Sequence, residues 1–240
     1  MGADVIVIGG GVIGLLSAYL LAGAGKRVAL VDRMAVGGEA SWAGGGIVSP
    51  LYPWRYSQAV TALAHWSQDY YPAFGERLLA HTGIDPEVHV TGLYWLDLDD
   101  QAEALAWARR EGRPLHEVPV ASAYAQVPVL GEGFERAIYM PGVANVRNPR
   151  LVKALRAALQ NLPNVTLLEH SPVLRFVRDD ARVIGVHTAE GEMLAEQVVV
   201  AAGAWSGELL QNLELSLPVE PVKGQMILFK CAEDFLPSMV

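Results

Sequence analysis

The chain has 240 residues and a formal net charge of −8, from 18 basic and 26 acidic side chains. This length suffices for one large α/β domain or two small ones, and a hydrophobic content of 52% excludes a disordered chain. The acidic balance, with no stretch dense in Lys and Arg, argues against nucleic-acid binding. The one cysteine, Cys231, excludes a disulfide scaffold and fits a reducing compartment, for which we expect the cytoplasm.

An uncharged stretch over residues 5–25 has about the length of a membrane-spanning helix. Glycines at positions 9, 10, 11, 14 and 23 interrupt it, and the only charge before it is that of Asp4, where a signal peptide would have a basic region. We therefore expect a buried strand, a turn and a buried helix, and no membrane partner. Twelve of the 24 glycines lie in the first 50 residues, where a ligand would need close approach to the backbone.

The first elements form a strand–helix–strand unit. Residues 4–8 are a continuous apolar run typical of a buried parallel strand, and residues 12–24 predict a helix that is apolar almost all round and hence buried. A second buried strand over residues 28–31 ends at Asp32. Such parallel crossovers are nearly always right-handed.

Later elements predict a second layer inserted into the first. From residue 85 to about 146, short apolar runs alternate with Pro-containing turns, which favours mixed or antiparallel structure. The predicted elements are a small-residue loop over 37–50, helices over 59–81, 101–111 and from Asn148-Pro149, strands over 165–169 and 197–202, a hairpin of 173–178 with 183–188, and a strand starting near Pro218.

Gly9-x-Gly11-x-x-Gly14 is the strongest chemical signal in the chain. It follows a strand, opens a helix, and has Asp32 at the end of the next strand, which is the context of a dinucleotide-binding turn. The glycines permit the turn and the approach of a pyrophosphate, which the helix N-terminus favours. Asp32 can accept hydrogen bonds from a ribose diol. This pattern does not separate FAD from NAD.

Further segments resemble the D-amino-acid oxidase superfamily of FAD-dependent amine oxidases, and within it most closely the glycine oxidases of thiamine biosynthesis. The resemblance rests on Val5–Gly14, on the Gly37–Gly46 segment GGEASWAGGG, on the Val198–Ser206 segment VVVAAGAWS and on the Pro221–Gln225 segment PVKGQ. It spans essentially the whole chain, although relatives run well over 300 residues. We therefore expect that the C-terminal third is missing.

The resemblance implies FAD as cofactor and a set of contacts to it. The glycine turn would hold the pyrophosphate, Asp32 and Arg33 the adenosine end, and Val173 the adenine through its backbone. The small-residue loop would line the flavin and the ribityl chain; Ala40 lacks the hydroxyl often found there in relatives. Arg33 as a solvated surface charge and Val173 as a plain strand residue remain open. The predicted cofactor-binding residues are Gly9, Gly10, Gly11, Val12, Ile13, Gly14, Asp32, Arg33, Ala40, Ser41, Gly45, Gly46, Ile47, Val173, Gly203 and Trp205.

The implied reaction is oxidation of a small amine, glycine or a D-amino acid, to the imine by hydride transfer to flavin N5, with O2 as acceptor. The family's substrate-clamping Arg and Tyr would lie beyond residue 240, so the catalytic residues remain unknown. No metal is expected, because the six histidines show no ligand spacing. The alternatives are a D-amino-acid dehydrogenase, another flavin amine oxidoreductase such as the oxidase module of a tRNA-modifying enzyme, or an incomplete FAD-binding fragment without activity.

The expected fold class is α/β, with a Rossmann-like FAD-binding domain and an inserted mixed or antiparallel α+β substrate domain. The FAD-binding domain would comprise residues 1–84 and 146–215, and the substrate domain residues 85–145. Residues 216–240 would begin a return to the substrate domain. Beyond a small amine or amino acid and O2, the partner we expect by analogy with relatives is a second copy of the chain, as a homo-oligomer.

Overall fold

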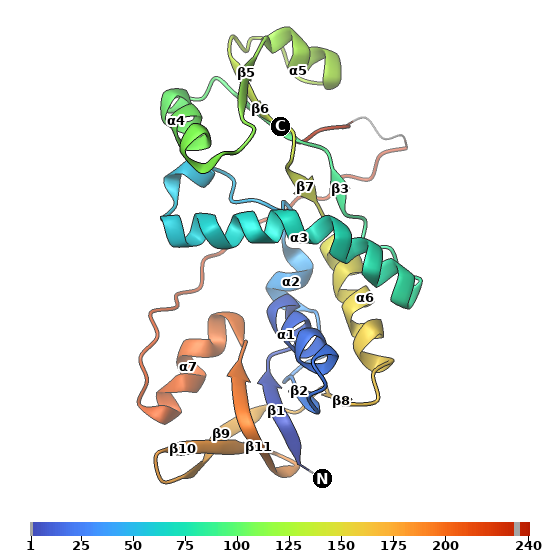
Figure 1. Cartoon of the computed structure of the whole chain (residues 1–240), viewed down its shortest axis with the longest axis vertical. Helices are drawn as coiled ribbons and strands as arrows, with labels where there is room; N and C mark the ends of the chain where they lie inside the picture. Colours follow the sequence, from blue (N-terminus) through green and yellow to red (C-terminus); the bar gives the residue numbers. More distant parts are fainter. Residues whose placement is uncertain (1, 233–235) are drawn as a thin grey trace. The chain divides into compact units, whose positions relative to one another are not determined.

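A computed structural model describes residues 2–232 and 236–240, and it divides into two compact units (Figure 1). Unit 1 comprises residues 2–45, 78–86 and 148–226, and unit 2 comprises 46–77, 87–147 and the described part of 227–240. The chain thus leaves unit 1 and returns to it. Residues 46–77, which the sequence-based boundaries place in the FAD-binding domain, pack within unit 2.

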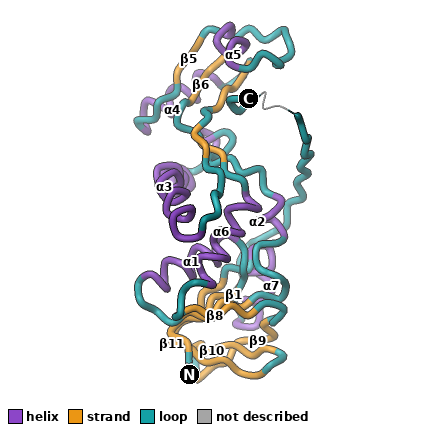
Figure 2. Tube along the Cα trace, turned by 90° about the vertical axis from the view of Figure 1, so that its right-hand side faces the viewer, coloured by secondary structure: helices purple, strands orange, loops and turns teal. Residues whose placement is uncertain are grey.

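Unit 1 is built on a six-stranded sheet with the order β8-β2-β1-β11-β10-β9. Figure 2 shows its strands in orange, near the N-terminus. The first four of these strands run parallel, and β10 and β9 extend the sheet as antiparallel strands. Ile6, Val7 and Leu30 on the central strands are fully buried. The strands are β1 (Ala3–Ile8), β2 (Val28–Val31), β8 (Val165–Leu168), β9 (Val173–Asp179), β10 (Arg182–Thr188) and β11 (Gly191–Val200).

Strand β11 differs from the predicted strand over residues 197–202. It begins at Gly191, and its first half pairs with β10 while its second half pairs with β1. The first half contains Glu192 and Glu196 and no β-branched residue, so it lacks the continuous valine run that marks residues 198–200. Ala201 follows the strand, and its N–H donates to the carbonyl oxygen of Ile8 at 2.8 Å.

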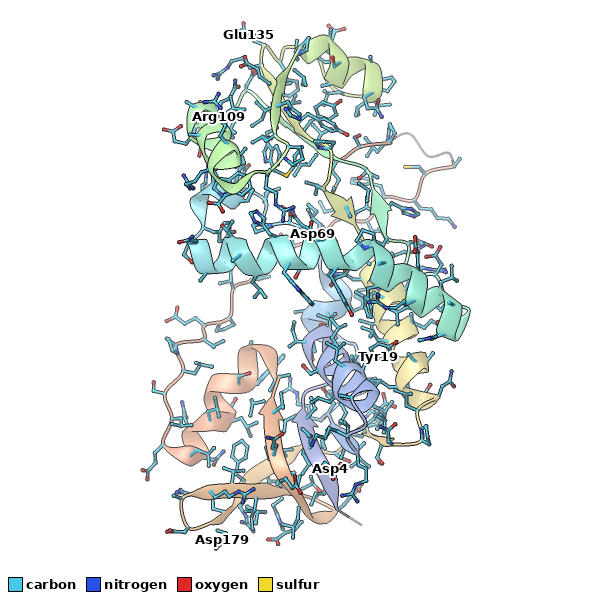
Figure 3. All side chains as sticks on the ribbon, viewed as in Figure 1. Asp4, Tyr19, Asp69, Arg109, Glu135 and Asp179 are labelled. Atoms are coloured by element: carbon cyan, nitrogen blue, oxygen red, sulfur yellow. The ribbon has the colours of Figure 1, made fainter. Side chains whose placement is uncertain are left out.

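Helix α1 (Val12–Gly23) connects β1 to β2 and contacts α6 (Asn148–Gln160). The expectation that α1 is buried all round was wrong. Leu15 and Ala18 are buried, whereas Ile13 is 65% and Leu20 51% exposed, because only one side of the helix meets the sheet and α6. At the start of β1, Asp4 pairs with Arg27 across the crossover; Figure 3 shows where Asp4 lies.

Helix α6 has the opposite character, with a clear apolar face. Leu151, Leu155 and Leu159 recur at helical spacing and are almost fully buried. Pro149 stands in its first turn, where the missing N–H costs nothing. The remaining elements of unit 1 are α2 (Glu39–Ala43), inside the predicted loop, and η2 (Gly203–Trp205), α7 (Ser206–Leu210) and η3 (Gln211–Leu213), which follow β11.

Unit 2 contains two antiparallel sheets, as the alternation of short apolar runs predicts. The strand order of the larger is β4-β6-β5, and β3 pairs with β7 in the smaller. Trp95, Trp107 and Ile138 form the centre of its core. Its elements are η1 (Pro53–Arg55), residues 58–77 of α3 (Gln58–Thr82), β3 (His89–Val90), β4 (Leu93–Leu96), α4 (Gln101–Glu111), β5 (His116–Val118), α5 (Val120–Gln126), β6 (Ala137–Met140) and β7 (Ala144–Asn145).

A charged pair closes one edge of this core. The Arg55 guanidinium donates two hydrogen bonds to the Asp100 carboxylate, at 2.7 and 2.9 Å, and the indole N–H of Trp54 donates a third at 2.8 Å. These contacts, the one from Arg55 first, lower the pKa of Asp100 to about 2.

The predicted strand near Pro218 is not formed. Residues 214–232 contain no helix or strand, and Val222 and Leu228 are 92% and 96% exposed. A strand needs a partner for its backbone groups, and no described strand pairs with this segment. Across the described residues, no helix combines the length and the apolar character that crossing a membrane requires.

Candidate functional site

The turn between β1 and α1 has a geometry that only glycine can adopt. Gly9 has a φ of +106°, and a Cβ there would collide with the carbonyl of Ala201 at the end of β11. A Cβ on Gly14 would overlap the carbonyl oxygen of Gly9. The first and third glycines of the motif therefore allow the turn to pass close to β11 and the helix to pack on the turn.

Ser41 caps helix α1 from another helix. Gly11 is the N-cap residue of α1 and has no side chain to satisfy the first N–H groups. The Oγ of Ser41 on α2 instead accepts the N–H of Val12 at 2.9 Å. The other N–H groups of the first turn, including that of Ile13, are the donors that an anion at this helix end would use.

Asp32 joins the ends of the first two strands. Its Oδ2 accepts the Gly10 N–H at 2.6 Å, and its Oδ1 accepts the Met34 N–H at 2.7 Å. The N–H of Gly37 donates to the carbonyl oxygen of Gly10 at 2.8 Å, so the segment after β2 lies directly against the glycine turn. The carboxylate is thus held in a fixed orientation at the carboxyl end of β2.

The loop after β8 supports the same segment. The Glu169 carboxylate accepts the Val36 N–H at 2.8 Å and a hydrogen bond from Arg156 at 2.6 Å. The N–H of Ser171 donates to the carbonyl oxygen of Asp32 at 2.8 Å. Loops from β1, β2 and β8 therefore meet at the carboxyl edge of the sheet, where open α/β sheets bind ligands.

A pocket of about 590 Å³ lies at this edge of unit 1. Twelve of the predicted cofactor-binding residues line it, and they come from segments that follow four different strands. These residues are Gly9, Gly10, Gly11, Val12, Ile13, Asp32, Arg33, Ala40, Ser41, Val173, Gly203 and Trp205.

Four predicted residues lie outside the lining. Gly14 is under the turn, in contact with Gly9. A Cβ on Gly45 would meet the side chain of Met226 at 3.5 Å. Gly46 and Ile47 belong to unit 2, where the Gly46 carbonyl oxygen accepts the Val146 N–H at 2.8 Å.

The sequence interpretation missed part of the lining. Most of the missed residues flank those that were found, or follow β8 and β11 directly. The rule that parallel strands present their carboxyl ends to one ligand would have indicated the latter. The missed residues are Ile8, Val31, Met34, Ala35, Gly37, Gly38, Glu39, Ser171, Pro172, Leu174, Ala201, Ala202, Ala204, Glu208, Leu209 and Asn212.

The site fits a dinucleotide and shows no feature of a metal centre. A glycine turn without side chains, a helix N-terminus and an oriented carboxylate match a pyrophosphate and a ribose diol. Among residues 2–232 and 236–240, no group of three or more His, Cys, Asp or Glu side chains is arranged to hold a metal ion.

The sequence profile of the FAD dependent oxidoreductase family (DAO) matches residues 4–239. The chain belongs to this family. FAD is the cofactor of the family, and the resemblance noted in the glycine turn and the later motifs is confirmed. The expected fold class is confirmed as well, since the structure is similar to glycine oxidase and other flavoenzymes of this fold.

Several relatives are named glycine oxidase. The chain is 69% identical to glycine oxidase of Pseudomonas putida over 240 residues, which cover all of this chain and 66% of that relative. It is 31% identical over 97% of its length to the bifunctional protein ThiO/ThiG of Trichormus variabilis, and covers 35% of that protein. The chain thus spans about two thirds of the length of the glycine oxidase and a smaller share of the bifunctional protein.

The solved structures extend the likeness. The crystal structure of glycine oxidase from Geobacillus kaustophilus has a TM-score of 0.80 at 32% identity, covering 90% of this chain and 59% of that one. The L-amino acid deaminase of Proteus myxofaciens also has a TM-score of 0.80, at 21% identity over 90% of this chain and 49% of that one, which shows a shared fold.

Proposed function

We propose that the pocket of unit 1 binds the ADP half of FAD. The N–H groups at Gly11 and in the first turn of α1 receive the pyrophosphate, and the Asp32 carboxylate accepts a hydrogen bond from the ribose. Val173 contacts the adenine through its backbone. The proposal is supported by the glycine turn, in which a Cβ on Gly9 or Gly14 would collide with the backbone and the turn is therefore free of side chains.

Within unit 1, α2 and Gly45 after it are proposed to lie along the flavin and ribityl chain. Ala40 and Ser41 line the pocket, and Gly45 offers a backbone N–H group without bulk. We assign Ser41 two tasks, because the hydroxyl that caps α1 also lines the pocket.

The proposed activity of the protein is oxidation of glycine or another small amine. The observation that carries it is 69% identity to the Pseudomonas putida glycine oxidase along the whole chain. Bound FAD supplies the hydride acceptor, flavin N5. The carbon–nitrogen bond of the substrate becomes an imine, and water converts it to an oxo acid and ammonia. With O2 as acceptor, glycine, water and O2 yield glyoxylate, ammonia and hydrogen peroxide.

What this chain contributes is position and electrostatics. Its described residues hold the dinucleotide and fix its orientation through the glycine turn and Asp32. We assign no substrate-contacting residue within the chain. The likeness to ThiO/ThiG supports a place in thiamine biosynthesis, and the exposed single thiol of Cys231 fits the reducing cytoplasm.

The activity is tested by anaerobic addition of glycine, sarcosine or D-alanine to the FAD-loaded protein. Loss of the flavin band near 450 nm on adding an amine supports the proposal, and re-admission of O2 should restore the band with release of peroxide. Bleaching that a dye reverses and O2 does not would indicate a dehydrogenase instead. An FAD-loaded protein that no amine bleaches would contradict the proposed activity.

A further inference from the structure

Arg33 and Trp205 stack on each other at the pocket although they are far apart in the chain. Arg33 directly follows Asp32 after β2, and Trp205 ends η2 after β11. The guanidinium carbon lies 3.9 Å from the centroid of the indole ring, which is the geometry of a cation–π contact. Both residues line the pocket.

A second contact constrains the same guanidinium. The Arg33 Nη2 lies 3.8 Å from a carboxylate oxygen of Glu39, the first residue of α2 and another residue of the pocket lining. The Arg33 side chain is 46% exposed and Trp205 is 38% exposed, so water also reaches the guanidinium beside the ring and the carboxylate.

The position of Arg33 bears on whether the pocket binds a nucleotide with or without a 2′-phosphate. An arginine beside the ribose-binding carboxylate is the group that accommodates a 2′-phosphate in sites that take phosphorylated dinucleotides. Here Asp32 would repel a 2′-phosphate and Arg33 would attract it. In the structure, however, the guanidinium is stacked on Trp205 and faces Glu39, and Asp32 stands next to it with a negative charge.

We propose that Trp205 is a positioning residue that holds the Arg33 guanidinium flat against the pocket wall. Held there, Arg33 forms a surface for the adenosine end and does not neutralise a 2′-phosphate. The site therefore selects an adenine nucleotide whose ribose carries a free 2′-hydroxyl. This inference rests on the proposed FAD site, and it assigns the nucleotide preference of that site to the stacking of Arg33 on Trp205.

The decisive experiment measures a ratio of affinities. ADP-ribose and 2′-phospho-ADP-ribose differ only in the 2′-phosphate, and each is titrated against the FAD-binding protein in competition with FAD. The wild-type protein should prefer ADP-ribose. Trp205→Leu should weaken ADP-ribose binding by about two- to five-fold, a factor comparable to one exposed cation–π contact, because the guanidinium must then be ordered before it can form a surface for the adenosine end. It should also reduce the preference, because the freed guanidinium can reach the phosphate.

Two further variants separate positioning from general damage. Trp205→Phe keeps an aromatic face and should retain most of the wild-type preference. Adding Arg33→Ala to Trp205→Leu removes the freed cation and should restore discrimination against the 2′-phosphate. A merely structural role of Trp205 would lower both affinities together and leave their ratio unchanged, and that result would overturn the inference.

The outcomes also distinguish this inference from the proposed FAD site. If the wild-type protein binds FAD but the affinity ratio is the same in Trp205→Leu, Arg33 is a solvated surface charge and only the inference fails. If the wild-type protein binds neither FAD nor ADP-ribose, both fail. Should Trp205→Leu not fold, Arg33→Lys replaces it, since a lysine keeps the charge without the flat stacking surface, and an unchanged ratio there would equally overturn the inference.

Discussion

The Ser41 hydroxyl accepts the N–H of Val12 at 2.9 Å and thereby caps a helix to which Ser41 does not belong. The two residues are 29 positions apart, and the contact ties α2 to the start of α1 at the pocket. Gly11 has no side chain that could cap α1. Ser41 on α2 therefore supplies the hydrogen-bond acceptor for the first N–H group of the helix.

Replacing Ser41 by alanine should remove this cap. We expect a loss of about 1 kcal/mol in the free energy of unfolding, as for other N-caps, together with weaker FAD binding. Urea unfolding and FAD titration measure the two effects. Ser122→Ala, an exposed serine on α5, is the control and should change neither. Equal behaviour of the two variants would refute the capping role.

Two glycines of α1 provide a matched pair. Gly14→Ala should destabilise the protein by several kcal/mol or prevent folding, because the new Cβ would overlap the carbonyl oxygen of Gly9. Gly23→Ala meets nothing within 4 Å and should be neutral or stabilising by up to about 1 kcal/mol. Thermal unfolding of both variants tests the contrast, and a tolerated Gly14→Ala would show that helix and turn are less closely packed.

Asp32→Asn should weaken both the fold and the ligand site. The asparagine oxygen can replace only one of the two acceptors that serve Gly10 and Met34, so one N–H loses its partner. The expected loss is about 1–3 kcal/mol of stability, with a clear fall in FAD affinity. Glu132→Gln, an exposed carboxylate in unit 2, serves as the control. Unchanged FAD affinity in Asp32→Asn would argue against a ribose contact.

Acid should remove the stabilisation that Asp100 provides. Its pKa is lowered from 3.8 to about 2 in the folded state, chiefly by Arg55, so the ion pair contributes fully above pH 4 and is lost as the pH falls from about 4 to about 2. Asp100→Asn should therefore be less stable than wild type at pH 7, and the difference should shrink across this window. Asp179→Asn, at an exposed position in unit 1, should show no such difference.

The parts of the site that could be predicted are those that local sequence determines. The glycine turn, α1, β2 and Asp32 lie within 30 residues of one another. Their residue types and spacing match the pattern of a dinucleotide-binding turn, which can be read from the local sequence. The hairpin of β9 and β10 and the start of α6 at Asn148 were likewise predicted from turn and capping residues.

The parts that could not be predicted depend on pairing between distant segments. Glu169 binds the Val36 N–H across 133 positions, and nothing in either local sequence indicates it. The first half of β11 was missed because it has no β-branched run like that of residues 198–200, and the strand near Pro218 is absent because its backbone has no described partner. Exposed Ile13 on α1 shows that an apolar composition does not by itself indicate burial.

Binding of FAD to the 240-residue chain tests the account most directly. The purified protein is titrated with FAD, followed by its absorption near 450 nm and its flavin fluorescence, with ADP as competitor and FMN as a ligand that lacks the adenosine half. The account predicts saturable FAD binding that ADP reverses and that FMN does not reproduce. Equal binding of FMN, or no binding of FAD or ADP, would contradict the assignment of the unit 1 pocket to the ADP half of FAD.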